Sequence, residues 1–264
     1  MAIDLNGLLK LMVDKKGSDL HLRFGYIPVI RIDGRLTPEV GHPALNAGDL
    51  ESAGKQMMSE RQWKAFLEQS EADLAYHVPG TGRFRANAFR QRGNISYVFR
   101  HVPTQIPQYD ELRLPAGVRK LAEFQRGLVV VTGTTGSGKS TTLAAMIDAI
   151  NASRSAHILT IEDPIEFLHE DKQSIINQRE LGLDTTDYHE ALKHVLRQDP
   201  DVIMVGELRD LETMSAAITA AETGHLVLST VHTIDAMQTI TRIIDVFPAH
   251  QQNQIRLQLA DVLK

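Results

Sequence analysis

Cysteine is absent from this sequence of 264 residues. Its absence excludes disulfide bonds, cysteine-ligated zinc, iron–sulfur clusters and thiol nucleophiles. Long apolar runs are also missing, and the longest of them is far too short to cross a bilayer. Residues 1–5 carry an acid and no basic leader, so we expect no secretory signal. The simplest interpretation of these absences is a protein of the cytoplasm.

The sequence also has no excess of positive charge. Its formal net charge is −5 and its pI is about 6.1, whereas dedicated nucleic-acid binders are usually basic. The segment 83–92 is a local exception, because arginines there are interleaved with phenylalanines. Such a pattern can stack on a single strand, but it is also the pattern of a β-strand with one apolar and one arginine face. We favour the strand and expect no nucleic-acid partner.

A glycine-rich octapeptide is the most informative feature that is present. A valine-rich apolar run at 127–132 precedes it, and apolar residues at helical spacing follow it. In this order of strand, loop and helix the octapeptide is a P-loop, which cradles phosphates with backbone N–H groups and the positive end of a helix. We expect Lys139 to reach the β- and γ-phosphates of ATP and the Ser140 hydroxyl to ligate Mg²⁺. The candidate ATP-binding residues are Gly133, Thr134, Thr135, Gly136, Ser137, Gly138, Lys139, Ser140 and Thr141.

The first hundred residues differ in pattern from the rest. Alternation of apolar and polar residues predicts strands at 19–23, 29–32 and 95–101 and a hairpin over 74–78 and 83–90. Helical spacing near residues 5–12 and a capping box formed by Ser59 and Gln62 predict two helices. Antiparallel strands with helices kept apart are typical of a small α+β domain, which we assign to residues 1–102.

Prolines crowd together in the next segment. They occupy positions 103, 107 and 115, and they predict a linker over residues 103–115. Residues 116–264 then alternate strands with helices, which predicts an α/β domain built on a parallel sheet. We expect strands at 127–132, 157–162, 201–206 and 225–231 and helices at about 139–152, 187–197, 210–222 and 236–246.

Charged residues at the ends of three predicted strands supply what a P-loop lacks for hydrolysis. A metal-ordering acid is needed, together with a group that positions water and positive charge against the transition state. The apolar run 201–206 leads into Glu207, a Walker B pattern that would hold Mg²⁺ through water. The run 158–162 leads into an acidic cluster that ends at Glu166. Such acids also occur as helix caps or solvated loop residues, but their shared position at one sheet edge favours a catalytic site.

Two histidines bracket the third of these strands. His225 and His232 lie seven residues apart, so the two-residue period of a strand predicts that they point to opposite faces. Only one of them is then expected to face the nucleotide, and we assign that role to His232. A histidine at a strand end is also common as a hydrogen-bonded structural residue.

Several motifs in combination resemble the type II/IV secretion ATPases. The matching segments are the P-loop run, the acidic run at 160–166, Asn-Gln-Arg-Glu at 177–180, Val-Gly-Glu-Leu-Arg-Asp at 205–210, and the histidine-bearing runs at 221–225 and 230–233. Ser-Asp-Leu-His-Leu at 18–22 and Arg-Phe-Arg-Ala-Asn at 83–87 extend the match into the N-terminal domain. Within the superfamily, these motifs are most similar to the type IV pilus retraction ATPases, the twitching-motility proteins.

The resemblance implies a fold, an assembly and a set of site residues. It implies a PAS-like N-terminal α+β domain joined to a RecA-like P-loop NTPase core, assembled as a homo-hexamer that uses ATP and Mg²⁺. Glu166 corresponds to the catalytic base, Glu207 to the Walker B glutamate and His232 to the sensor of the γ-phosphate. Arginines on the small domain are implied to close onto the nucleotide as donors against developing phosphate charge, here Arg83, Arg85 and Arg100.

The resemblance also implies a function. A retraction ATPase drives pilus disassembly together with an inner-membrane platform protein, on the cytoplasmic side of the inner membrane. Extension and type II secretion relatives remain the alternative, but they commonly carry a four-cysteine zinc module that this sequence lacks. Family members continue beyond residue 264, and the chain stops part-way through a predicted helix, which keeps open an accessory subunit with little turnover. A nucleic-acid translocase shares the RecA core but fits neither the acidic charge nor the pilus-type motifs.

Overall fold

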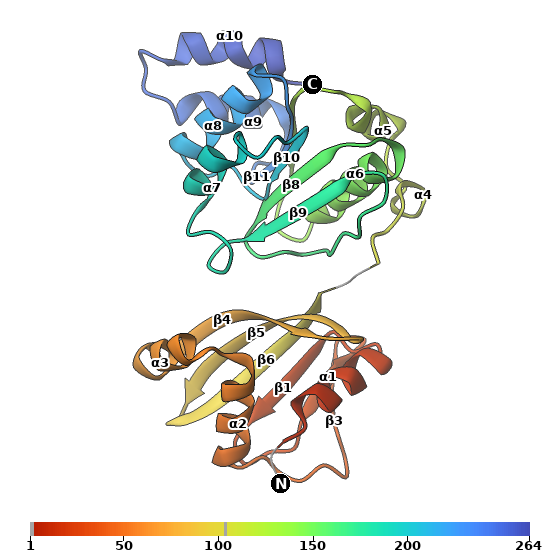
Figure 1. Cartoon of the computed structure of the whole chain (residues 1–264), viewed down its shortest axis with the longest axis vertical. Helices are drawn as coiled ribbons and strands as arrows, with labels where there is room; N and C mark the ends of the chain where they lie inside the picture. Colours follow the sequence, from red (N-terminus) through yellow and green to blue (C-terminus); the bar gives the residue numbers. More distant parts are fainter. Residues whose placement is uncertain (1–2, 103–104) are drawn as a thin grey trace. The chain divides into compact units, whose positions relative to one another are not determined.

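The computed structural model describes residues 3–102 and 105–264, and the chain divides into two compact units, Met1–Pro103 and Thr104–Lys264. Residues 103 and 104 of the expected linker therefore lie outside the described residues. Figure 1 shows both units.

The N-terminal unit is one antiparallel sheet with helices packed on it. The sheet has six strands in the order β3-β2-β1-β6-β5-β4, and every neighbouring pair is antiparallel. Three helices supply the apolar cover of one face. The elements are α1 (Leu5–Asp14), β1 (Asp19–Arg23), β2 (Val29–Ile32), β3 (Arg35–Pro38), α2 (Ala47–Met57), α3 (Glu60–Gln69), β4 (Glu71–Val78), β5 (Gly82–Gln91) and β6 (Asn94–Val102).

Alternation along β5 confirms the interpretation of the arginine-rich segment as a strand. Phe84, Ala86 and Ala88 are fully buried in the core, whereas Arg83 and Arg85 point to the other face. The predicted capping box is also present, because Ser59 accepts from the backbone of Gln62 and the Gln62 side chain accepts from the backbone of Ser59. The sequence therefore correctly predicted both the hairpin of β4 and β5 and the helix α3 that precedes it.

Part of the expected linker belongs to the C-terminal unit. A short helix, α4 (Tyr109–Leu112), lies within residues 103–115, and α5 (Ala116–Glu123) follows it. The Tyr109 ring is buried among the apolar residues of the second unit. A single helical turn is too short to produce a periodic pattern, so the sequence showed only the prolines around it.

The C-terminal unit is an α/β domain with a parallel five-stranded sheet. The strand order is β7-β11-β10-β8-β9, and every neighbouring pair is parallel. The elements after α5 are β7 (Gly127–Thr132), α6 (Lys139–Ser153), β8 (His157–Glu162), β9 (Ile175–Glu180), α7 (Tyr188–Val195), β10 (Val202–Val205), α8 (Leu211–Glu222), β11 (Leu226–Val231), α9 (Ala236–Asp245) and α10 (Gln252–Val262). The four predicted strands and four predicted helices are all found within two residues of the expected bounds.

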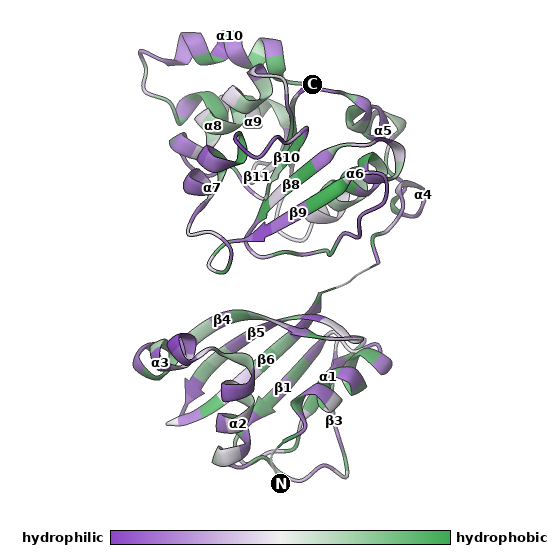
Figure 2. Cartoon of the chain, in the orientation of Figure 1, coloured by the Kyte–Doolittle hydropathy of each residue, from purple (hydrophilic) through white to green (hydrophobic). Residues whose placement is uncertain are grey.

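Alternate residues of the central strands bury two separate cores. Ile203 and Val205 face α7, α8 and α10 on one side of the sheet, and Val202 and Met204 face α5 and α6 on the other. Strands covered on both faces are mainly apolar, and β10 is apolar throughout, which explains why they were readable in the sequence. Green stretches mark these apolar residues along β8 in Figure 2. The carboxyl ends of the strands meet at one edge, where an open α/β sheet places its ligands.

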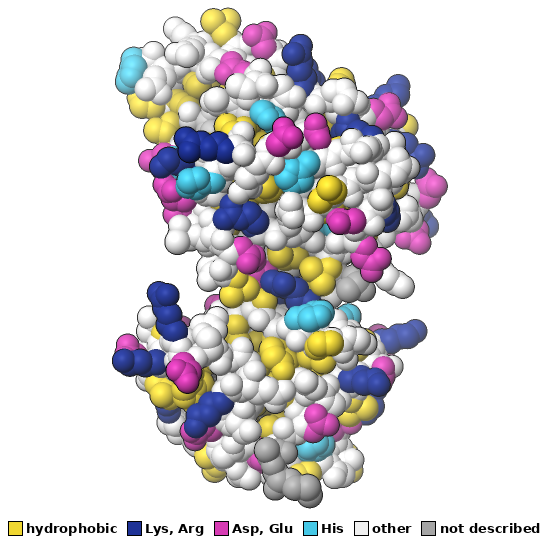
Figure 3. Space-filling model, in the orientation of Figure 1, with side chains coloured by type: hydrophobic (Ala, Val, Ile, Leu, Met, Phe, Trp, Pro, Cys, Tyr) yellow, Lys and Arg dark blue, Asp and Glu magenta, His cyan; other side chains and the backbone are white. Residues whose placement is uncertain are grey.

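None of the helices that the structure describes is both long and apolar enough to span a membrane. On the visible face of the C-terminal unit, charged side chains of both signs are interspersed (Figure 3).

Candidate nucleotide site

The P-loop joins the end of β7 to the start of α6. Gly133 has no room for a side chain, because a Cβ there would collide with the Ser137 hydroxyl. Gly138 caps the amino end of α6 with a φ of 92°, in the left-handed region that favours glycine. Among the described residues, no side chain caps the first turn of α6. The backbone N–H groups of that turn and the helix dipole therefore face the loop, which is an anion-binding arrangement.

The Lys139 ammonium lies inside this loop. Its Nζ donates to the carbonyl oxygens of Gly133 and Thr134, each at 2.9 Å, and the residue is buried. Thr134, Thr135, Gly136, Ser137 and Ser140 are exposed along the loop, and Thr141 is half-buried. The structure thus holds a positive charge at the centre of a ring of backbone groups, with hydroxyls beside it.

Glu207 follows β10 at the same edge of the sheet. Its Oε2 is 2.7 Å from Nη2 of Arg209 and 3.5 Å from Nε2 of His232, and only 15% of its side chain is exposed. The structure therefore brings together Glu207 and His232, which the sequence had assigned to one site. Arg209 was not among the predicted site residues, although it belongs to the motif at 205–210 and lies two residues after the Walker B acid.

The two histidines lie just beyond opposite ends of the third strand, β11 (Leu226–Val231). His232 follows the carboxyl end of β11 beside Glu207, whereas His225 precedes the amino end and its Nδ1 contacts the Ala220 carbonyl at 2.9 Å. Both residues lie just outside the strand, so the alternation argument for opposite faces does not apply to them. The assignment of His232 to the nucleotide edge stands on the direction of the strand.

The acidic run from the end of β8 into the following loop contains one buried and one exposed glutamate. The buried one is Glu162, whose Oε1 accepts from the Thr160 hydroxyl at 2.6 Å and whose carboxylate accepts from the backbone N–H of Glu166. Burial raises the pKa of the Glu162 carboxyl, and the hydrogen bonds act against that rise. Glu166 itself is exposed, in the loop that follows. The geometry therefore presents Glu166 rather than Glu162 to solvent and to a ligand.

The oxygen donors at this edge fit Mg²⁺. Within residues 3–102 and 105–264, no three His, Cys, Asp or Glu side chains gather in one metal-binding group. Mg²⁺ does not require such a cage, because it keeps several waters and takes one or two protein oxygens beside the phosphates. The exposed Ser140 hydroxyl and the Glu207 carboxylate are donors of that kind. Ser140 lies at the start of α6, after the P-loop that follows β7, and Glu207 lies after β10. Because β11 lies between β7 and β10, the ends of these two strands are roughly 10 Å apart.

The three predicted arginines share one face of the N-terminal sheet. Arg85 on β5 is the direct cross-strand partner of Arg100 on β6, and Arg83 lies two residues from Arg85. The Nε of Arg100 donates to the buried carboxylate of Asp19 at 2.9 Å. This face therefore carries a cluster of guanidinium groups, and the orientation of one of them, Arg100, is set by an acid on the neighbouring strand β1.

Comparison with known proteins identifies the family. The family "Type II/IV secretion system protein" matches residues 107–263, and the chain is 47% identical over 262 residues to the type IV pilus retraction ATPase PilT of Pseudomonas aeruginosa, spanning 99% of this chain and 76% of that protein. The chain belongs to the type II/IV secretion ATPase family. It is also 48% identical to a twitching motility protein of Neisseria gonorrhoeae, over 89% of this chain and 63% of that protein.

Solved structures agree with this assignment. The fold superimposes on the crystal structure of the pilus retraction motor PilT with bound ADP with a TM-score of 0.94, covering 99% of this chain and 76% of that one. The match confirms the RecA-like core and the smaller N-terminal domain that the sequence predicted. Membership of the family makes the chain an ATPase.

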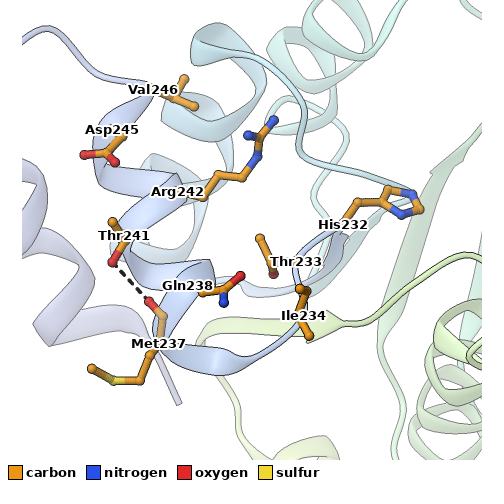
Figure 4. Close-up of a pocket in the computed structure, with 9 residues that line it drawn as sticks. All are labelled: His232, Thr233, Ile234, Met237, Gln238, Thr241, Arg242, Asp245 and Val246. Atoms are coloured by element: carbon orange, nitrogen blue, oxygen red, sulfur yellow. Dashed lines mark hydrogen bonds between the residues drawn. The ribbon is translucent and has the colours of Figure 1, made fainter.

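A groove runs along the outer side of α9 in this secretion ATPase, with a volume of about 590 Å³. His232 lies at one end of it, and the exposed side chains of Ile234 and Met237 form an apolar rim (Figure 4). The lining comes from residues 232–246, so the groove adjoins the predicted nucleotide site at His232.

His169, in the acidic loop of this ATPase, should make stability depend on pH. Burial lowers its pKa to about 4, against the opposing effect of Asp148, and Lys172 adds to the decrease. Between that value and about 6.5 the unfolded chain binds more protons than the folded one, so stability falls as the pH falls. We expect a loss of about 2 kcal/mol between about pH 7.5 and about pH 5, measured by urea unfolding.

His169→Gln should flatten this dependence. His250→Gln, at an exposed histidine, should keep the wild-type slope. Equal slopes in wild type and His169→Gln would show that another group causes the acid sensitivity.

Proposed function

We propose that this chain is the ATP-hydrolysing motor of type IV pilus retraction. One observation carries the proposal: identity to a pilus retraction ATPase extends over 99% of the chain, through the N-terminal unit as well as the ATPase core. The family description by itself covers residues 107–263 only. A resemblance confined to the core would support an ATPase of any branch, whereas the N-terminal match supports the retraction branch.

The test of this function is complementation of twitching. The chain, expressed in a piliated bacterium that lacks its own retraction ATPase, should restore twitching and reduce the number of surface pili. Restored motility without loss of surface pili, or an increase in piliation, would assign the chain to extension instead. No change in either, with the protein present at normal levels, would contradict a motor function.

The site residues suit the steps of ATP hydrolysis. We propose that the Lys139 ammonium exchanges the Gly133 and Thr134 carbonyls for phosphate oxygens, with little movement of its buried stem. Glu166, exposed in the loop after β8, would act as the general base toward the attacking water. The Ser140 hydroxyl and the Glu207 carboxylate would hold Mg²⁺, which when bound would supply positive charge to the phosphates. His232, beside Glu207, would then sense the γ-phosphate.

Positive charge against the transition state would come from the N-terminal unit. We propose that Arg83, Arg85 and Arg100 close onto the nucleotide by a hinge motion of the two units. Arg100 is already oriented by Asp19, so less side-chain freedom is lost when it binds phosphate. In the same proposal six copies of the chain form a ring at the cytoplasmic face of the inner membrane, engaged with the platform protein of the pilus machine.

His232→Ala should lower ATP turnover more than His225→Ala. The imidazole of His232 is 3.5 Å from the Glu207 carboxylate, whereas His225 lies at the opposite end of β11. Loss of one positioned group at the phosphates costs about 10²-fold in turnover, and we expect less than about threefold for His225→Ala because it leaves the nucleotide edge intact. Steady-state phosphate release measures both, and equal losses would remove His232 from the site.

A further inference from the structure

The loop that carries Glu166 has no regular structure of its own, so its position depends on what holds it. It runs from residue 163 to 174, between β8 and β9. An irregular segment of this kind must satisfy its backbone groups through side chains or water. The described contacts show which side chains do so around Glu166.

Four polar side chains on one face of the sheet lie against this loop. Thr160 and Glu162 on β8 are the register partners of Gln178 and Glu180 on β9, so all four side chains lie on the same face. We call these four residues the polar square. Thr160, Glu162 and Glu180 are buried, and this end of β9 is the hydrophilic one in Figure 2. Buried polar groups are costly unless they are hydrogen-bonded.

The polar square finds its partners in the backbone of the loop. The Ile165 N–H donates to Glu180 Oε2 at 3.0 Å, and the Glu166 N–H donates to Glu162. The backbone at Glu166 is thus bonded to two acids of the sheet, since its own N–H donates to Glu162 and the N–H of Ile165 donates to Glu180. These two bonds fix where the Cα of Glu166 lies relative to the sheet.

Gln178 contributes a second set of bonds just after Glu166. Its Oε1 accepts from the His169 N–H at 2.9 Å, while its Nε2 donates to the Phe167 carbonyl at 2.9 Å and to Glu162 Oε1 at 3.0 Å. Both hydrogens of the amide and its oxygen are therefore used. The same side chain ties the loop on the carboxyl side of Glu166 and orients the acid that holds the Glu166 amide.

The far half of the loop has a separate anchor. The buried amide of Asn151 on α6 donates to the Glu170 carbonyl at 2.7 Å and accepts from the Lys172 N–H at 3.0 Å. Loss of Gln178 would thus free the segment around Glu166 while the loop stays attached further on. This separation makes the effect of Gln178 local.

We propose that Gln178 is a positioning residue for hydrolysis, which holds the loop so that the Glu166 carboxylate meets the attacking water. The proposal rests on the proposed role of Glu166 as general base. It predicts an effect on the chemical step and little effect on nucleotide binding, because the P-loop is held by other elements. A displacement of about 1 Å at a catalytic group can cost about 10²-fold in rate.

Steady-state ATPase assays on the full chain test the proposal. Gln178→Leu removes all three bonds, and Gln178→Glu keeps the size and the acceptor for His169 but loses both donors. We expect kcat to fall about 10- to 100-fold in each variant, with the dissociation constant for an ATP analogue within about twofold of wild type. Asn177→Ala, at the neighbouring amide on the opposite face, should leave both values unchanged. An unchanged kcat in Gln178→Leu, or an equal change in binding and kcat, would overturn the proposal.

Hydrogen exchange gives an independent readout of position. Amides of residues 165–169 should exchange faster in Gln178→Leu, and those of α6 should keep wild-type protection. Unchanged protection of residues 165–169 would contradict the anchoring role whatever the activity.

A double variant separates this inference from the proposed function. If Gln178 acts through Glu166, adding Gln178→Leu to Glu166→Gln should cause no further loss of kcat. Full multiplication of the two losses would overturn the coupling. Wild-type turnover in Glu166→Gln alone would refute the base assignment itself, and the exchange data would still decide whether Gln178 holds the loop.

Discussion

Lys139→Ala should abolish nucleotide turnover and weaken nucleotide binding. The Lys139 ammonium is buried in the P-loop and already bonded to two of its carbonyls, so alanine removes the one positive side chain held at the loop's centre. A charge-assisted hydrogen bond contributes about 1.5–3 kcal/mol, which corresponds to roughly 10- to 150-fold in binding. Turnover should fall by at least about 10²-fold, since the charge also stabilises the transition state. Titration with a fluorescent ATP analogue and phosphate release measure the two effects.

Lys172→Ala is the matched control for this prediction. Lys172 is ion-paired to Asp148 at 2.6 Å on the far half of the acidic loop, so its removal tests the loss of a lysine without touching the P-loop. We expect ATP binding and turnover close to wild type. Wild-type turnover in Lys139→Ala would mean that the octapeptide does not bind the transferred phosphates.

Glu166→Gln should bind ATP normally and hydrolyse it poorly. The substitution keeps the size of the side chain and removes its basicity, and general-base catalysis contributes about 10²- to 10⁴-fold. The backbone N–H of Glu166 that donates to Glu162 is unaffected by the change, so the loop should keep its place. Glu166→Ala should show the same separation of binding from hydrolysis. Single-turnover phosphate release, with binding measured in parallel, gives both quantities.

Glu170→Gln controls for the loss of one negative charge from the same loop. Glu170 is exposed, and its backbone carbonyl is the part that the Asn151 amide holds. We expect turnover within about twofold of wild type. If Glu170→Gln and Glu166→Gln lose activity equally, the effect belongs to loop charge and not to a base at Glu166.

Much of the C-terminal fold was readable because its central strands are buried on both faces. Runs such as 202–205 are apolar throughout, and glycine and proline interrupt the pattern where the strands end. The strand β9 was missed for the opposite reason. Among the described residues it pairs with β8 alone, and four of its six residues are Asn-Gln-Arg-Glu. Of these, Gln178 and Glu180 face a loop instead of an apolar layer. Tertiary contacts, which no local pattern records, determine that strand.

The same difference applies to the candidate site. The P-loop is contiguous in sequence, and Glu207 and His232 follow apolar strands, so their positions at one edge followed from the direction of parallel strands. The contact of Arg209 with Glu207 depends on a side-chain rotamer, and the bonds of Gln178 depend on the path of the loop from 163 to 174. Neither the Arg209 contact nor the Gln178 bonds produce a periodic pattern in the sequence. Both are visible only in the three-dimensional structure.

The strand order has a mechanical consequence. Because β11 lies between β7 and β10, the strand that leads to His232 is hydrogen-bonded on one side to the P-loop strand and on the other to the Glu207 strand. Helix α9 begins only four residues after His232. Ile234 in the turn before the helix and Met237 in its first turn form the exposed apolar rim of the groove. A single short turn therefore joins the residue beside Glu207 to an outer surface of the unit.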